Sequence, residues 1–157
     1  MDEFDAADRK VLADIERTGW SDIGVFPTKE NQGNPFNYTV GLTKINHAEL
    51  ITMGMVNDQA HHLLRSVVYL IQHGWTFKPN VYSGDVLEGS FDVAFVEVLD
   101  MYSKDYPMNM VSHLEMPDPT ALQVIWPDRN NRFPWHPNFQ EEFKDRQVLL
   151  GPWMGDL

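Results

Sequence analysis

The segment from Trp126 to Trp135, with the sequence WPDRNNRFPW, carries the side chains best suited to chemistry in this chain. Its ten residues include two indoles, the guanidiniums of Arg129 and Arg132, and the carboxylate of Asp128. Indoles stack on planar groups, and a guanidinium can hold a carboxylate or phosphate through two parallel hydrogen bonds. The two prolines restrict the backbone and the central asparagines tolerate a tight reversal, so the pattern predicts a rigid loop. We expect this loop to bind a small planar anion, such as a nucleotide.

A structural interpretation of the same segment stays open. The loop could be a plug in which both indoles cover the sheet and the arginines pair with acids on the N-terminal helix. Asp128 would then cap the turn.

Three polar residues elsewhere are further candidates for ligand contacts. Alternation along residues 36–42 places Asn37 and Thr39 on the face opposite the apolar side chains, where a ligand or solvent could meet them. His47 lies two residues before Glu49 and could act as a general base, or tie down a turn.

The motifs of familiar enzymes are missing from the sequence. His61 and His62 are adjacent on a predicted helix and point in different directions, and no pair of histidines has the spacing of a local zinc site. There is no cysteine, no Gly-x-Ser-x-Gly elbow and no phosphate-binding loop, so we expect no metal and no cofactor. Two alternatives to ligand binding remain: a small hydrolase or lyase with His47 or His113 as base near Asp128, and a protein-interaction module that docks a partner or a second copy through its C-terminal third.

Charge narrows the range of partners. Twelve Lys and Arg against twenty-three Asp and Glu give a formal net charge of −11, which repels the phosphate backbone of extended DNA or RNA. Basic residues nevertheless gather near the C-terminus, at Arg129, Arg132, Lys144 and Arg146. A small anion could therefore find a local basic pocket.

The length of the chain and the absence of cysteine limit the classes of protein to which it can belong. A chain of 157 residues fits one domain, 1–157, with a core that needs no disulfide. The acidic start is unlike a signal peptide, and no apolar run reaches membrane-spanning length. We expect a cytoplasmic protein that does not engage membranes and that could form a homo-oligomer.

Hydrophobic periodicity predicts the elements that position these residues. Helices are expected over residues 4–18, ending at Gly19, and 57–71, closed by Gly74, with a short third helix over 102–114. Strands are expected over residues 23–26, 36–42, 50–53, 91–98 and 122–126. The order of these elements favours an α+β fold with a mainly antiparallel sheet of about five strands packed with two to three helices, and a C-terminal wrap after Pro137.

Several separated segments together resemble a bacterial family known as domain of unknown function 4262. They are Asp8 to Gly19, Tyr38-Thr-Val-Gly-Leu42, His47-Ala-Glu-Leu50, Leu122 to Asp128 with Phe133-Pro-Trp135, and Leu149-Leu-Gly151. Ala48 stands where the family usually has Pro, and Asn131 where it usually has Gly. Asn131 is expected to keep the positive φ of the turn. The resemblance implies one fold over nearly the whole chain and no assigned activity.

Two of these segments, Tyr38 to Leu42 and Trp126 to Trp135, contain residues that favour a particular shape of backbone or surface rather than a regular helix or strand. We therefore expect the Trp126 to Trp135 loop to pack beside the strand from Tyr38 to Leu42.

Overall fold

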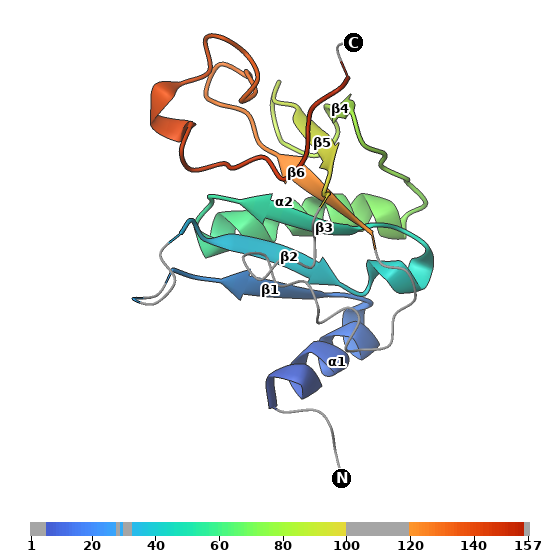
Figure 1. Ribbon diagram of the computed structural model, residues 1–157. Helices are drawn as coiled ribbons and strands as arrows, with labels where there is room; N and C mark the ends of the chain where they lie inside the picture. The colour runs from blue at the N-terminus through green and yellow to red at the C-terminus, as the bar shows by residue number, and fades with distance from the viewer. Residues whose placement is uncertain (1–5, 28, 30–32, 100–119, 156–157) are drawn as a thin grey trace.

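A six-stranded sheet forms the centre of the protein, seen in a computed structural model that describes residues 6–27, 29, 33–99 and 120–155 (Figure 1). The strands are β1 (Ser21–Val25), β2 (Phe36–Val40), β3 (Glu49–Met53), β4 (Val81–Ser83), β5 (Val93–Glu97) and β6 (Ala121–Ile125). Their order across the sheet is β1-β2-β3-β6-β5-β4. Neighbouring strands are antiparallel except β3 and β6, which are parallel.

The α+β class is confirmed, but the sheet is mixed and has six strands rather than five. The parallel pair lies at its centre, with Leu50 opposite Leu122. Alternation along a strand reports which faces are buried, but it carries no information about the direction of the partner strand. The extra strand, β4, has only three residues and two of them are exposed, so it lacks the pattern of a buried strand.

Two α-helices flank the sheet: α1 (Ala6–Thr18) and α2 (Asn57–Gln72). Gly19, at φ +92°, donates its N–H to the carbonyl of Ile15 and ends α1, while Gly74 at φ +99° follows α2. Two 3-10 helices, η1 (Leu42–Ile45) and η2 (Glu141–Phe143), complete the helical segments of the described residues. The predicted helix over 102–114 lies outside the described residues.

The sheet is covered on both faces (Figure 1). The apolar side of α2 packs on one face and forms the largest core cluster with side chains of β3, β5 and β6, among them Leu50, Phe95 and Val124. On the other face, Val11 of α1 packs against Tyr38 of β2. The C-terminal segment covers the β5 and β6 part of that second face, so strands such as β6 are buried on both sides.

Glutamine side chains attach the C-terminal segment to the sheet. The buried Gln123 in β6 donates from Nε2 to the carbonyl of Val148 at 2.7 Å and accepts the N–H of Leu150 at 2.8 Å. These bonds satisfy backbone groups of the C-terminal segment, which is not paired with a strand there, and the expected C-terminal wrap is confirmed.

Candidate functional site

The loop that follows β6 is organised by the carboxylate of Asp128. One oxygen accepts the backbone N–H groups of Asn130 and Arg132 at 2.8 and 3.0 Å, and the other accepts the N–H of Gln140 at 3.0 Å. Burial alone would raise the pKa of this carboxyl, but the three backbone donors together with the Arg132 guanidinium lower it below its ordinary value. Asp128 therefore closes the turn and ties it to the C-terminal segment.

Asn131 holds the reversal of the same loop. Its φ is +58°, the left-handed conformation expected for a tight reversal. Its side chain accepts the N–H of Asp92 at 2.8 Å and donates to the carboxylate of Asp92 at 3.0 Å. The predicted positive φ is confirmed, and the asparagine adds side-chain bonds that Gly could not make.

Trp126 is fixed at the end of β6 with 6% of its surface exposed. The indole Nε1 donates to the carbonyl of Met53 at 2.8 Å. The side chain of Gln147 accepts the N–H of Trp126 at 2.9 Å and donates to its carbonyl at 2.8 Å. These bonds make Trp126 a rigid wall.

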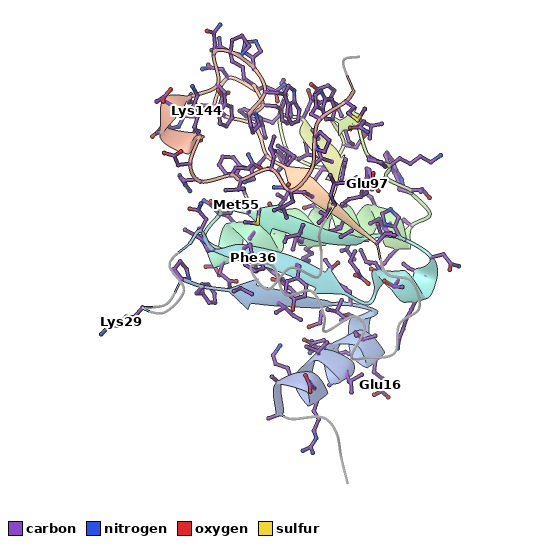
Figure 2. The ribbon with its side chains drawn as sticks, in the orientation of Figure 1. Glu16, Lys29, Phe36, Met55, Glu97 and Lys144 are labelled. Carbon is purple, nitrogen blue, oxygen red and sulfur yellow. The ribbon has the colours of Figure 1, made fainter. Side chains whose placement is uncertain are left out.

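The wall faces a cavity of about 530 Å³, here called the Trp126 cleft. Its lining is mostly apolar and comes from four parts of the chain: Met55, Val56, Gln59, Leu87, Phe91, Trp126, Pro127, Asp128, Arg129, Phe143 and Arg146. Figure 2 shows Met55 at the end of the sheet that faces the C-terminal segment bearing Lys144. The volume is within the range of small-molecule sites.

Two guanidiniums stand at the aromatic wall of the Trp126 cleft. That of Arg146 lies 5.8 Å from the Trp126 ring and 5.4 Å from the Phe143 ring, and donates to a backbone carbonyl. That of Arg129 lies 5.3 Å from the same Phe143 ring and pairs with Glu142. Because both partners of that ion pair are largely exposed, it contributes little to stability and an incoming anion can replace the carboxylate. The cleft therefore combines flat apolar walls with two cations.

The other half of the predicted site lies elsewhere. Arg132 and Trp135 line a separate cavity of about 290 Å³, together with Tyr82 and His136. The Trp135 ring stacks on Trp153 at 4.4 Å with an interplanar angle of 1°. The two predicted indoles thus belong to different cavities and do not form one platform.

The structural alternative required these arginines to pair with acids of the N-terminal helix, and within the described residues they do not. Arg132 donates to the backbone carbonyl of Asn138, and Arg129 pairs with Glu142. Both partners follow the loop in the sequence. The loop folds back on the C-terminal segment, which is nearer in space than α1.

The predicted contact between this loop and the strand from Tyr38 to Leu42 is also wrong. Strand β3 lies between β2 and β6. Because β3 and β6 are parallel, Trp126 leaves the sheet beside Met53, at the end where β2 begins with Phe36. Leu42, the first residue of η1, follows the other end of β2.

Thr39 and its neighbours build a buried turn that binds a carboxylate at that other end of β2. The carboxylate of Glu49 is fully buried and accepts five hydrogen bonds. They come from the hydroxyls of Thr39 and Thr43 and from the backbone N–H groups of Gly41, Leu42 and Thr43. The expected solvated face of this strand is wrong, because α2 covers it and Thr39 is 0% exposed.

His47 is bonded through both ring nitrogens. Its Nε2 accepts the backbone N–H of Phe77 at 3.0 Å, so the neutral ring carries its proton on Nδ1, 2.9 Å from the carbonyl of Ala48. The lone pair that a general base needs is therefore already used, and the histidine ties the turn before β3 to the chain after α2.

Asn37 is buried in a polar group that includes Asp22 of β1 and Asn57 of α2. Its Nδ2 donates to both carboxylate oxygens of Asp22 at 3.0 and 3.1 Å and to Oδ1 of Asn57 at 2.9 Å. The described residues that line the Trp126 cleft do not include Asn37, Thr39 or His47, and whether any of the three contacts a ligand stays a prediction.

Motif reasoning did not single out several residues of the cleft, among them Arg146 and Phe143. Arg146 belongs to the basic cluster near the C-terminus, which was the available signal. Nothing in the sequence around Phe143 indicates that its ring lies between two guanidiniums, because that contact joins segments brought together only by the wrap.

Metal ligands do not converge in the described part of the chain. No group of three or more His, Asp or Glu residues there is arranged to hold a metal ion. Within the same residues, no helix is long and apolar enough to cross a membrane.

The fold and the cleft define the class of this protein: an α+β domain with one mixed sheet and a cation-bearing cleft beside the end of β6. The chain belongs to the family described as Domain of unknown function (DUF4262), which matches residues 14–140. No curated protein and no solved structure matches the chain.

Proposed function

We propose that this protein binds a small planar anion, of the nucleotide class, in the Trp126 cleft. The observation that carries the proposal is the placement of Arg129 and Arg146 on the same aromatic ring at the wall of an apolar cavity. A planar group would lie against the exposed Phe91 and the partly exposed Phe143, and its anionic group would meet the two guanidiniums.

The cation of Arg129 is the more available of the two. Its present partner, Glu142, is half exposed, and besides this surface ion pair its carboxylate accepts only one long hydrogen bond among the described residues, from Nε2 of Gln140 at 3.4 Å. Arg146 is oriented by its bond to the carbonyl of Gly54 at 3.1 Å, which positions it without neutralising it. Asp128 is no competitor for the ligand's donors, because its oxygens already accept three backbone N–H groups.

A thermal-shift screen with nucleotides and planar aromatic acids tests this proposal. A ligand at one hundred times its Kd stabilises the fold by about 2.7 kcal/mol, which raises the Tm of a protein of this size by about 5–10 °C. Arg129→Gln should weaken binding by roughly tenfold or more, since a charged hydrogen bond contributes about 1.5–3 kcal/mol, and should leave Tm nearly unchanged without ligand.

Arg132→Gln is the matched control, because Arg132 lies on the same loop but lines the other cavity. Equal loss of affinity in the two variants would refute the assignment of the cleft, and a screen without any stabilising ligand would refute the function.

The remaining sequence-based expectations stay predictions. They are bacterial or phage origin, a cytoplasmic location, self-association, and the two alternative functions of a histidine-based hydrolase or lyase and of a protein-interaction module. Of the two histidines proposed for the enzyme, His47 has its lone pair engaged and His113 lies outside the described residues.

A further inference from the structure

A second cleft, of about 450 Å³, lies where α1, β1 and α2 meet at the β1 edge of the sheet. It shares no lining residue with the Trp126 cleft. Its lining is more polar than apolar and includes Trp20, Asp22, His61 and Arg65. We call it the His61 cleft.

The ring of His61 is held in one orientation at this cleft. Its Nδ1 lies 2.8 Å from Oδ2 of Asp22, and its plane stacks on Trp20 at 5.7 Å with an angle of 12°. An ionised carboxylate only accepts hydrogen bonds, so the proton of the neutral ring sits on Nδ1 and Nε2 keeps its lone pair. No residue of the described chain bonds to that Nε2, and the side chain of His61 is 48% exposed.

Asp22 is itself positioned by a partly buried polar network. Both of its oxygens accept from Nδ2 of Asn37, which also donates to Asn57 at the start of α2. A Cβ at Gly24 would lie 2.8 Å from Oδ1 of Asn57 and 3.3 Å from Nδ2 of Asn37, so a larger residue would disturb the network. The carboxylate and the histidine are therefore oriented by groups behind them, as in sites where a histidine exchanges protons.

The charges around the ring favour an anion. Arg65 lies one helical turn after His61 on the same face of α2, is exposed, and makes no ion pair with any described residue. Lys10 and Arg17 of α1 share the single carboxylate of Asp14. Three permanent cations thus face two carboxylates in a chain whose net charge is −11.

We propose that the His61 cleft binds the phosphate group of a small phosphomonoester, with Arg65 pairing its oxyanion and Nε2 of His61 sharing one proton with a phosphate oxygen. The second pKa of a phosphomonoester is about 6, so near neutral pH a phosphate oxygen can itself bring the proton that is shared with Nε2. With the proton on Nε2 the contact is an N–H···O hydrogen bond, and with the proton on the phosphate oxygen it is an N···H–O hydrogen bond. A carboxylic acid, with a pKa of about 4, brings no proton at neutral pH, so it makes no hydrogen bond with the lone pair of the neutral ring.

NMR of the histidine ring nitrogens tests this site with phenyl phosphate, and benzoate serves as the carboxylate of similar shape. Phenyl phosphate should shift the His61 resonances in a saturable manner, whereas benzoate should bind at least tenfold more weakly. Resonances of His62, the next residue on α2, should not move. Equal affinity for the two anions, or no shift of His61 at millimolar phenyl phosphate, would overturn the proposal.

Arg65→Gln should weaken phenyl phosphate binding tenfold or more and leave Tm unchanged, because the side chain is exposed and unpaired within the described residues. Arg65 also borders a neighbouring cavity with His62, so movement of the His62 signals in place of those of His61 would assign the anion to that cavity and refute ours. His62→Gln is the matched control and should retain full affinity.

Asp22→Asn tests the positioning role of the carboxylate. The variant should lose the preference for a proton on Nδ1, visible in the ring nitrogen shifts before any ligand is added, and should bind phenyl phosphate more weakly. An unchanged tautomer would contradict the orientation argued here. Arg129→Gln, in the Trp126 cleft, should leave phenyl phosphate binding at His61 intact. The proposals for the two clefts are therefore tested independently.

Discussion

Replacing Glu49 by Gln should destabilise the fold far more than an isosteric change usually does. The carboxylate is fully buried, and its two oxygens accept five hydrogen bonds from the turn between β2 and β3. A glutamine keeps the shape but turns one of these acceptors into an NH₂ donor that faces other donors.

The size of the effect follows from which donors lose their acceptor. If the amide nitrogen takes the place of Oε1, the Thr39 hydroxyl can rotate, but the N–H of Leu42 cannot. If it takes the place of Oε2, the N–H groups of Gly41 and Thr43 are both left unpaired. A buried unpaired donor costs about 1–3 kcal/mol, and the surviving bonds lose the contribution of the charge. We expect a total loss of about 3–5 kcal/mol, equivalent to a fall in Tm of about 6–20 °C.

Urea denaturation measured by circular dichroism checks this expectation. Glu97→Gln is the control, because Glu97 is an exposed residue of β5 and its replacement should change stability by less than about 0.5 kcal/mol. Similar unfolding midpoints for the two variants would refute the view that the Glu49 carboxylate holds the turn.

Two further predictions concern the loop and the wrap. In Asp128→Asn, the pH dependence of stability should flatten: the pKa of Asp128 is lowered in the fold, so its stabilising contribution is complete above the unfolded value of about 3.9 and is lost as the pH falls through the folded value. Acid titrations of unfolding free energy should therefore show wild type and variant converging as the pH falls through the folded pKa of Asp128, and a constant difference between them would contradict the shift. Gly54→Ala should destabilise by about 2–4 kcal/mol, because a Cβ there would lie 2.0 Å from the carbonyl oxygen of Arg146 and φ is +83°. Gly74→Ala, at φ +99° with open space around it, should cost only about 1 kcal/mol, and equal costs in denaturant melts would show that the close approach is unimportant.

Local patterns were sufficient for most elements of this fold. The spacing of apolar residues predicted α2 and five of the six strands, and Gly19 and Gly74 mark the helix ends because few other residues adopt positive φ readily. Asn131 was predicted to hold the loop turn for the same reason, and it does. These features depend on a few consecutive residues, which a sequence displays directly.

The arrangement of the strands could not be predicted from the same patterns. The parallel β3–β6 pair places β3 between the segments Tyr38 to Leu42 and Trp126 to Trp135, which were expected to touch. Alternation also suggested a solvated face for Asn37 and Thr39, whereas both side chains are buried beneath α2 in contact with acids. A polar residue in a strand can face water or a buried partner, and only the tertiary structure supplies the partner.

The sequence by itself determined the types of side chain available: a rigid loop with indoles and guanidiniums, a basic cluster near the C-terminus, and no cysteine. Only the tertiary structure decided which of them share a cavity. In the folded protein, Arg129 lines the same cavity as Phe143 and Arg146, whereas Arg132 and Trp135 line another. His61 is bonded to Asp22, which lies 39 positions away in the chain. Contacts of this kind are made between distant segments, and their geometry is set by the packing of the whole sheet rather than by local propensity.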